Sequence, residues 1–509
     1  MDALRPVALA TQPPPTSMDA DGLLTRLGGF FAARSDTDVW LVGGAVRDAI
    51  LGREIHDIDL AVAGDSEPIG RAVADYLGGT AVPVEAWNVT RVALPPANDS
   101  AAPFIIDVSG YCGSFEDDLR ARDFTVNAIA LPLRCWDSDE RIESILDPLN
   151  GRADMVRRIL RATGDDVFRN DPGRMLRGVR LAKSLDFRMT PETAQAVRRD
   201  AHLLERIAPE RVRDEFMAIL AADGARAQLE ILDRLGLLCR VIPELEAARN
   251  CEQPRAHHYW DVLGHLLHCV EYAEEITAGR RNSAIYTMAP WTAVEDAYFS
   301  EAIGDGHNRR TVLKLAALLH DIAKPQTRGP DENGRIRFLG HSEQGAEVVE
   351  TLLPKLRVAG RTTSLVSAMV LHHLRPSQLR EGDQMPSRRA IYRYYRDVGD
   401  AAVDTLYLAM ADFLAARGPE LSPERWNNYA RMIATVLEAG ATPQAGDDGP
   451  RGLVNGHDLM DTLHMEPGPR VGALLERLRE AQAVGEVSNR EEALSLAARL
   501  LDDDAIEVG

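Results

Sequence analysis

The stretch LVGGAVRDAILGREIHDIDLAV, residues 41–62, decides how this chain begins to fold. The apolar run Asp38–Val42 has the length of a strand and ends at two glycines, and helical spacing resumes from Ala45. A strand, a glycine turn and a helix together open an α/β unit. Further strand-like runs follow at Ile58–Val62, Val89–Leu94 and Phe104–Val108. We therefore expect a small mixed sheet with helices up to about residue 160.

Two aspartates, Asp57 and Asp59, open the strand-like run that closes this stretch. Residues i and i+2 of a strand point to the same face, so the two carboxylates converge while Ile58 and Leu60 point into the core. Close carboxylates repel one another, and a divalent cation is the usual way to satisfy both. An isolated Asp-x-Asp is more often a solvated acidic turn. The glycine turn beside it favours instead a Mg²⁺ site for phosphoryl or nucleotidyl transfer.

The glycine turn itself suits a phosphate ligand. Gly43 and Gly44 let the backbone approach a ligand closely, and the helix that follows begins with free N–H groups. Arg47, one turn into that helix, is placed to add a charge-assisted contact to the same phosphate. Because Gly-Gly turns are common, this interpretation depends on the carboxylate pair downstream.

A ladder of one acidic and three basic residues, spaced three apart, lies at Asp171, Arg174, Arg177 and Arg180. On a helix this spacing forms a slowly drifting row on one side. A carboxylate accepts from an exocyclic amine and a guanidinium donates to ring acceptors, so Asp171 and Arg174 together are suited to read a base edge. Arg177 and Arg180 are then placed for phosphates. The alternative is a salt-bridged surface helix, which a charge ladder without context favours.

Histidines and aspartates recur at helix-sized intervals in the second half of the chain. Imidazoles and carboxylates gathered from several helices are the usual construction of a metal site in a helical bundle. Lone histidines on apolar faces are more often core residues, but an adjacent His-Asp pair with further His and Asp residues favours a metal site. The residues concerned are His265, His320, Asp321, His341, His372, His373 and Asp412.

Composition bounds the remaining possibilities. The 509 residues suggest three to four compact units, and the net charge of −20 excludes a polybasic nucleic-acid binder. The charge is segregated, because residues 151–213 carry a local +6. Five cysteines without a C-x-x-C pair favour a reduced, cytoplasmic setting. We expect neither a signal peptide nor a membrane partner, since no apolar run reaches the roughly 18 residues of a transmembrane span.

With these motifs in place, residues 41–62 resemble the signature of the class II tRNA nucleotidyltransferase and poly(A) polymerase family, within the DNA polymerase β-like superfamily. Residues 120–128 and 171–180 resemble two further motifs of that family. The resemblance implies that Asp57 and Asp59 are catalytic and hold Mg²⁺. Asp107, at the end of a strand-like run, is a candidate third carboxylate. The nucleotide-binding residues implied by the resemblance are Gly44, Arg47, Arg122, Asp171, Arg174, Arg177 and Arg180.

The cluster of histidines and aspartates resembles the HD phosphohydrolase domain. This resemblance implies that His265, His320, Asp321 and Asp412 bind a second divalent metal, with His341 and His372 nearby. Some family members that carry this domain at their C-terminal end have phosphatase or cyclic phosphodiesterase activity. Whether the domain is catalytic here or only a helical scaffold for tRNA stays open. The segment from Ala278 to Arg310 is polar and is expected to be loop-like.

We therefore expect an α+β protein in which a small mixed-sheet nucleotidyltransferase head precedes a mostly α-helical remainder. The expected parts are a flexible N-terminal segment with a short helix (1–35), the head (36–165), a helical neck that binds the base and the RNA (166–250), an HD domain (251–435) and a helical tail (436–509).

The resemblance implies a template-independent enzyme that builds or repairs the 3′-terminal CCA of tRNA from CTP and ATP by a two-metal mechanism. A poly(A) polymerase, or an enzyme that adds only CC or only A, would share every motif quoted. Metal-dependent phosphohydrolysis in the HD domain is a further alternative. The sequence leaves the oligomeric state open.

Overall fold

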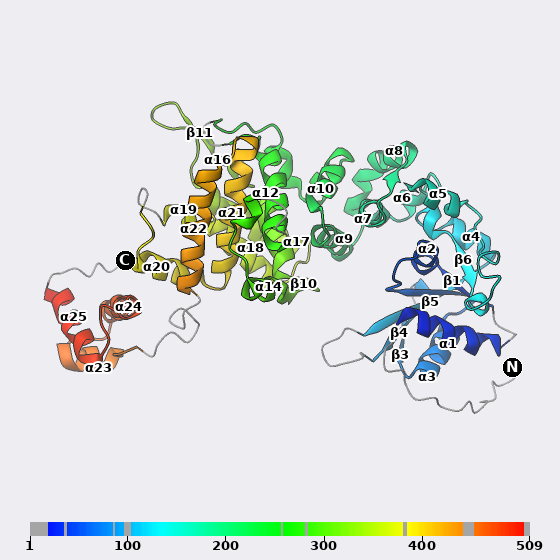
Figure 1. The fold of residues 1–509 in the computed structure, drawn as a ribbon, viewed down its shortest axis with the longest axis horizontal. Coiled ribbons are helices and arrows are strands. Elements are labelled where there is room, and N and C mark those ends of the chain that lie inside the picture. Colours follow the sequence, from blue (N-terminus) through cyan, green and yellow to red (C-terminus); the bar gives the residue numbers. More distant parts are fainter. Residues whose placement is uncertain are drawn as a thin grey trace. The chain divides into compact units, whose positions relative to one another are not determined.

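The computed structural model divides into two compact units, residues 1–203 and residues 204–509 (Figure 1). Each unit has its own core and is described by itself. The residues described are 19–34, 38–84, 87–95, 103–255, 258–279, 284–379, 384–440 and 452–502. The flexible N-terminal segment expected from the sequence lies outside these ranges up to residue 18.

The first unit is built on a six-stranded mixed sheet in the order β3-β4-β5-β2-β1-β6. Neighbouring strands are antiparallel except β2 and β5, which run parallel. The small mixed sheet predicted from the sequence is thus confirmed, with β3 and β6 as additional strands. Its strands are β1 (Val39–Val42), β2 (Ile58–Ala63), β3 (Thr80–Val84), β4 (Val89–Leu94), β5 (Phe104–Tyr111) and β6 (Ala130–Pro132).

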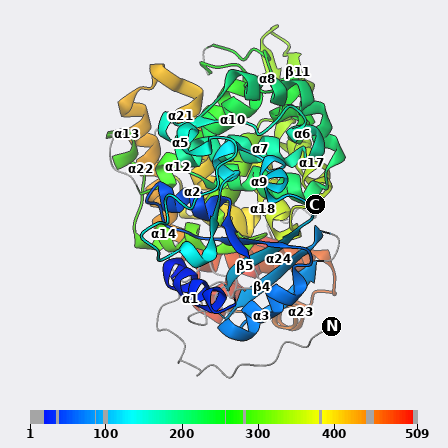
Figure 2. The same ribbon diagram turned by 90° about the vertical axis from the view of Figure 1, so that its right-hand side faces the viewer.

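Short helices flank this sheet. The helix α3 packs along β3, β4 and β5, and it lies beside β4 in both views (Figures 1 and 2). The helix α1 begins where the Asp19 carboxylate accepts a hydrogen bond from the N–H of Gly22, the usual N-cap arrangement. The elements are α1 (Ala20–Ala32), α2 (Gly44–Ile50), α3 (Glu67–Leu77), α4 (Phe115–Arg120) and the 3₁₀ turns η2 (Thr125–Asn127) and η3 (Leu133–Cys135).

The rest of the first unit brings α7 (Gly173–Leu185) against the sheet domain. A Cβ atom at Gly178 would lie 2.7 Å from Cζ of Phe124, so only glycine permits this approach. Met175, Leu176 and Val179 bury the apolar face of α7. The other elements are α5 (Gly151–Arg157), β7 (Ile159–Leu160), α6 (Val167–Asn170), β8 (Arg188–Met189), α8 (Pro191–Asp200) and η4 (Ala201–Arg206), whose last residues belong to the second unit.

The second unit is almost entirely helical. The buried helix α12 packs against α15 and α21, and α17 packs against α18. Its first elements are α9 (Pro209–Ala221), α10 (Ala225–Arg234), α11 (Leu238–Val241), η5 (Pro243–Ala248), α12 (Val262–Thr277), α13 (Ala284–Thr287), α14 (Ala293–Ser300), β9 (Ala302–Gly304), β10 (His307–Asn308), α15 (Arg309–Leu319), α16 (Lys324–Thr327), β11 (Arg328–Pro330) and β12 (Ile336–Phe338). It continues with α17 (His341–Lys355), α18 (Gly360–His372), α19 (Arg375–Gln378), α20 (Arg388–Val398), η6 (Gly399–Ala401), α21 (Ala402–Arg417), η7 (Gly418–Glu420), α22 (Pro423–Gly440), α23 (Gly456–Leu463), α24 (Pro469–Ala483) and α25 (Arg490–Asp502).

The segment between Ala278 and Arg310 differs from the loop predicted for it. Thr292 and Glu295 form a capping box that starts α14, and a short antiparallel hairpin of β9 and β10 follows. Trp291 stacks on Phe299, with ring centroids 5.8 Å apart. Local capping and aromatic packing therefore order the described residues from 284 onward despite their polar composition.

The helices α23, α24 and α25 enclose a small apolar core of their own. Glu480 of α24, which is buried, forms ion pairs with Arg389 at 2.9 Å and with Arg393 at 2.8 Å, both on α20. The final helical piece predicted from the sequence is confirmed. In the described part of the chain, no helix is both long and apolar enough to cross a membrane.

Candidate active site

Three carboxylates of the first unit lie in the middle of the sheet. Asp57 directly precedes β2 and is exposed, and Asp59 is the second residue of β2. Asp107 on β5 is the register partner of Asp59 across the parallel pair. The pKa of Asp59 is raised to about 6, chiefly by burial; Arg122 lowers it, and the negative charges of Asp107 and Asp57 also raise it. A carboxylate that ionises with this difficulty is a good ligand for a cation.

Gly43 lies close to both Asp59 and Arg122. It adopts a φ of +70°, which side chains with a Cβ rarely tolerate, and a Cβ there would lie 3.3 Å from Nη1 of Arg122 and 3.7 Å from Oδ2 of Asp59. The next residue, Gly44, is the first of α2. The positive φ of Gly43 shows that the turn needs a glycine there, whereas the close approach of the turn to a ligand and the phosphate contact of Gly44 stay predictions.

Arg47 is only 8% exposed and lies among protein oxygens. Its Nε and Nη2 donate to the two carboxylate oxygens of Asp48 at 2.9 and 2.7 Å, and its Nη1 donates to Oδ1 of Asn127 at 2.6 Å. Arg47 thus ties α2 to the turn η2 in this structure. The phosphate contact predicted for it stays a prediction.

Arg122 connects the carboxylates to the arginine ladder. Its guanidinium lies beside Gly43 and 3.4 Å from Asp118, and its buried Nε has no hydrogen-bond partner. Arg174, on α7, donates from Nη1 to the carbonyl oxygens of Ala121 at 2.9 Å and of Arg122 at 3.3 Å. Arg174, the first arginine of the ladder, is therefore held against the segment that carries Arg122.

The other residues of the ladder lie near Arg174. Asp171 lies 3.8 Å from Arg174, and the exposed Arg177 lies 3.6 Å from the buried Asp123. Arg180 follows one turn later and is half-buried. The structure brings Asp171, Arg174 and Arg177 to the side of the head that carries Arg122. The single helical row predicted for the ladder is wrong at its first residue, because Asp171 precedes α7 in extended backbone.

A second cluster lies among the helices of the second unit. Nε2 of His265, on α12, lies 3.2 Å from Nε2 of His320, 3.3 Å from Oδ2 of Asp321 and 3.1 Å from Oδ1 of Asp412. All four residues predicted for this site therefore converge. His265, His320 and Asp321 are completely or almost completely buried.

The other oxygen of Asp321 faces a further pair of histidines. Oδ1 of Asp321 lies 3.4 Å from Nε2 of His341 and 3.6 Å from Nε2 of His373, and these two nitrogens are 3.3 Å apart. The expectation that His372 lies near the site is wrong, because the adjacent His373 takes that place. Neighbouring helical residues point about 100° apart, so only one of the pair can face the cluster.

The chemistry of these side chains fits a divalent cation. Nδ1 of His320, His341 and His373 each contacts a backbone carbonyl oxygen, at 3.0, 2.6 and 2.7 Å. A ring that donates from Nδ1 keeps a lone pair on Nε2 for a metal. The Nε2 atoms face one another in two pairs, His265 with His320 at 3.2 Å and His341 with His373 at 3.3 Å. Oδ1 of Asp321 is buried without a hydrogen bond. Burial also lowers the pKa of His373 to about 4, which keeps that ring neutral and able to bind a metal.

Lys324 supplies a positive charge beside this cluster. Its buried ammonium lies 2.5 Å from Oδ2 of Asp321 and donates to Oε1 of Gln253 at 2.8 Å. Asp321 is therefore shared between a lysine and two groups of histidines.

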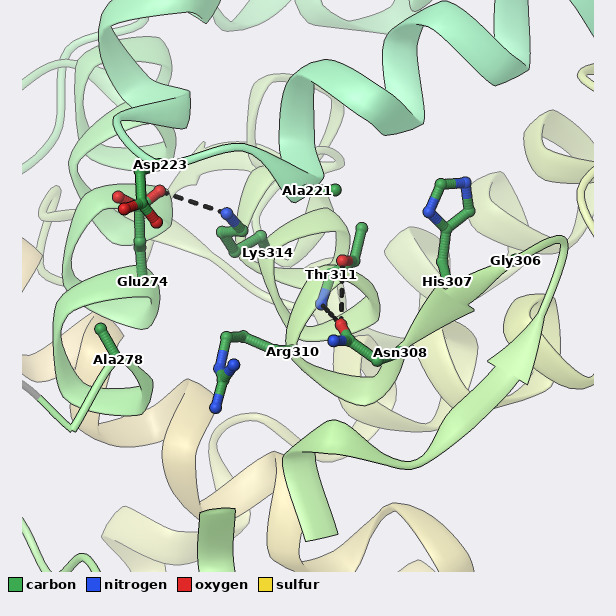
Figure 3. A pocket seen from close by; sticks show the side chains of 10 residues that line it. All are labelled: Ala221, Asp223, Glu274, Ala278, Gly306, His307, Asn308, Arg310, Thr311 and Lys314. Atoms are coloured by element: carbon green, nitrogen blue, oxygen red, sulfur yellow. Dashed lines mark hydrogen bonds and ion pairs between the residues drawn. The ribbon is translucent and has the colours of Figure 1, made fainter. Parts of the chain in front are cut away.

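A separate polar cavity of about 280 Å³ lies between α12 and α15 (Figure 3). Lys314 points into it toward Glu274, 3.2 Å away, and also donates to the carbonyl oxygen of Ala222. Glu274 accepts in turn from the first N–H groups of α10 at Gly224 and Ala225. The contacts of Lys314 and Glu274 thus join α10, α12 and α15. None of the site residues predicted from the sequence lines this cavity.

Comparison with known proteins decides the family. Residues 39–161 match the poly A polymerase head domain, and residues 186–249 match the probable RNA and SrmB-binding site of polymerase A. The A-adding tRNA nucleotidyltransferase of Deinococcus radiodurans is 35% identical over 483 residues, which cover 91% of this chain and 95% of that protein. The chain belongs to the tRNA nucleotidyltransferase family. It is therefore an enzyme of that class.

Other comparisons agree. The CC-adding tRNA nucleotidyltransferase of Thermus thermophilus is 32% identical and covers 90% of this chain and 92% of its own length. The solved structure of a CCA-adding enzyme with CTP has a TM-score of 0.60 at 18% identity, covering 95% of this chain and 99% of that one, and it shows the shared fold.

In this tRNA nucleotidyltransferase, the matched head domain contains the whole carboxylate row and Arg122. Residues 262–408 match the HD domain, and residues 451–498 match a putative tRNA nucleotidyltransferase domain 2. Asp412 lies just beyond the HD match but reaches the cluster. Head and HD domains of these kinds generally use divalent metals. Four residues have roles at these sites that were not predicted from the sequence: Arg91, which pairs with Asp107, and Asn127, Lys324 and His373. Only His373 carried a signal, as half of a His-His pair.

Proposed function

We propose that this enzyme builds or repairs the 3′-terminal CCA of tRNA from CTP and ATP. The observation that carries the proposal is the row of Asp57, Asp59 and Asp107 beside Arg122 and Arg174, in a chain that aligns with tRNA nucleotidyltransferases over nine-tenths of its length. We place the protein in the cytoplasm, where tRNA and both nucleotides occur.

In this proposal Asp57 and Asp59 hold Mg²⁺, and Asp107 is the third carboxylate. Bound Mg²⁺ would activate the 3′-hydroxyl of the RNA and neutralise the triphosphate. Asp59 fits this role because its charge is poorly solvated and is repelled by its neighbours. The glycine at position 43 keeps a side chain away from Asp59 and Arg122, so that both can face the nucleotide.

Base selection is assigned to Asp171 and Arg174, which present one acceptor and several donors without a nucleic-acid template. Arg174 is anchored on the backbone of Ala121 and Arg122, so the position of its guanidinium follows that of Arg122. Arg177 and Arg180 are proposed to contact phosphates, and so are Gly44 and Arg47.

The comparisons also support a second activity, in which the enzyme adds only part of the CCA end. Two of the relatives that align over nine-tenths of the chain each add part of the CCA end by name, A in Deinococcus and CC in Thermus. The protein is therefore also a candidate for addition of A alone or of CC alone, and a poly(A) polymerase would share its motifs.

Three tRNA substrates separate these activities. The protein is incubated with CTP and ATP and with tRNAs that end before the first C, after CC and after CCA, and the products are sequenced. Complete CCA addition extends the first two substrates and leaves the third unchanged. Extension of only one substrate identifies an A-adding or CC-adding enzyme, and long adenosine tails identify a poly(A) polymerase. No extension of any substrate would contradict the proposal.

We further propose that the HD cluster is a second divalent metal site with phosphohydrolase activity. Its support is the shared carboxylate of Asp321, which faces His265 and His320 with one oxygen and His341 and His373 with the other. Cyclic phosphate and 2′-nucleotide substrates are assayed with Ni²⁺, Mn²⁺ and Mg²⁺. His320→Ala should abolish hydrolysis, whereas His464→Ala, an exposed histidine of the tail, should not. Equal hydrolysis by both variants, or no hydrolysis by the native protein, would exclude this activity.

A further inference from the structure

Arg91 lies at the end of the carboxylate row that crosses the sheet. Arg91 on β4 is the register partner of Asp107 on β5, and Asp107 is the register partner of Asp59 on β2. Register partners on adjacent strands point to the same face of a sheet. One cation and two carboxylates therefore stand side by side on one face, with Asp57 next to them in sequence.

The contact between Arg91 and Asp107 is bidentate. Nε of Arg91 lies 2.9 Å from Oδ1 of Asp107, and Nη2 lies 2.8 Å from Oδ2. This geometry fixes the plane of the carboxylate as well as its position. The negative charges of Asp57 and Asp59 also act on Arg91 and help to keep it ionised.

The fold does not require this pair. The side chain of Arg91 is 56% exposed and that of Asp107 is 28% exposed, and exposed ion pairs contribute only about 0–1 kcal/mol to stability. The strands β4 and β5 are already paired along six residues each, from Val89 to Leu94 and from Phe104 to Ser109. What Arg91 does supply is a charge of opposite sign at the edge of three carboxylates.

We propose that Arg91 is a positioning residue for nucleotidyl transfer, which holds Asp107 in the orientation used when divalent cations are bound. The inference rests on the proposed roles of Asp57 and Asp59. Arg91 has two effects that oppose each other. It orders Asp107, which favours turnover, and it cancels part of the negative charge of the row, which weakens cation binding.

These opposing effects give a signature that general loss of structure would not produce. Arg91→Ala should bind Mn²⁺ about fivefold more tightly at the head site, because one neighbouring positive charge is gone. It should lower kcat for nucleotide incorporation about tenfold, because Asp107 is no longer held. The KM for the nucleotide should stay within about twofold, since Arg91 is not proposed to touch the triphosphate.

Mn²⁺ binding is measured by electron paramagnetic resonance on the full chain, and the binding that remains in Asp57→Ala is subtracted to remove other sites. Arg71→Ala is the matched control, because Arg71 pairs with Glu67 on the surface of α3. It should behave as the native protein. Arg91→Lys keeps the charge but loses the bidentate contact, so its Mn²⁺ affinity should be native while its kcat is reduced.

A double-mutant cycle decides whether Arg91 acts through Asp107. In an Asp107→Asn background, Arg91→Ala should cause no further loss of kcat. A loss that persists there would overturn the proposal, because Arg91 would then act on the substrate directly. Unchanged or weaker Mn²⁺ binding in Arg91→Ala would also overturn it. Either result leaves the proposed function standing as long as the native protein extends tRNA and Asp57→Ala does not.

Discussion

Asp59→Asn should stabilise the metal-free protein while it abolishes nucleotide incorporation. The carboxyl of Asp59 has a pKa of about 6 in the folded chain against 3.8 for an ordinary aspartate. The folded state therefore holds the proton more tightly than the unfolded state does. Ionisation destabilises the fold as the pH rises from about 4 to about 6, and the full penalty applies above pH 6. An asparagine of the same shape carries no such penalty.

The size of the expected stabilisation follows from the pKa shift of Asp59. A difference of about two pKa units corresponds to about 3 kcal/mol, and partial exposure of Asp59 reduces this to about 1–2 kcal/mol. For a unit of 150–250 residues, 1 kcal/mol moves the melting temperature by about 2–4 °C. Asp59→Asn should thus raise the melting temperature of the first unit by about 2–8 °C at pH 7.5 without metal.

The assay is thermal unfolding by calorimetry, which can resolve the transitions of the two units, on the full chain at pH 7.5 and pH 4 with a chelator present. The rise in melting temperature caused by Asp59→Asn should be largest at pH 7.5 and should have mostly disappeared at pH 4. Added Mg²⁺ should narrow the difference, because a cation that binds the folded native protein stabilises it. Asp75→Asn, an exposed carboxylate of α3, is the control and should show no such pattern.

The reasoning is refuted if Asp59→Asn melts at or below the native temperature at pH 7.5 without metal. It is also refuted if the gain is the same at both pH values, since the stabilisation would then have no connection with ionisation of Asp59.

Three further predictions concern other parts of the molecule. Arg174→Ala should reduce the preference between CTP and ATP more than it slows incorporation, which single-nucleotide kinetics with each substrate would test; unchanged selectivity would contradict the role in base selection. Gly178→Val should destabilise the first unit by about 1–3 kcal/mol, because its Cβ would lie 2.7 Å from Cζ of Phe124; a native melting temperature would contradict this packing. Asp321→Ala should cost the second unit about 3–5 kcal/mol, because Lys324 is left buried without its carboxylate; Asp321→Ala in a Lys324→Met background should then cost less, and an equal cost in both backgrounds would show that the ion pair is not responsible.

Four strands could be predicted from the sequence, because each is a short, mostly apolar run bounded by polar or glycine residues. They are β1, β2, β4 and β5. The strand β3 could not, because it is an exposed edge strand that contains Pro83. The strand β6 has only three residues, too few for any period to show.

The site could be predicted where a single element carries it. The two-residue period of a strand brings Asp57 and Asp59 together, and the helical spacing on α7 places Arg174 and Arg177 one turn apart. Asp171 precedes α7 in extended backbone, so its position beside Arg174 does not follow from helical periodicity. Arg91 was not predictable in this way, because its partner depends on the register between β4 and β5. The choice between His372 and His373 depends on how α18 is rotated against α17, which tertiary packing decides.

The central claim is that Asp57 and Asp59 carry nucleotidyl transfer to the 3′ end of tRNA. The most direct test follows incorporation of labelled CTP and ATP into tRNAs that lack part of the CCA end, by the native protein, Asp57→Ala, Asp59→Ala and the control Asp75→Ala. Circular dichroism verifies that each variant is folded. The account predicts that the native protein and Asp75→Ala incorporate nucleotide while Asp57→Ala and Asp59→Ala, though folded, do not. Incorporation at the native rate by both Asp57→Ala and Asp59→Ala would contradict it.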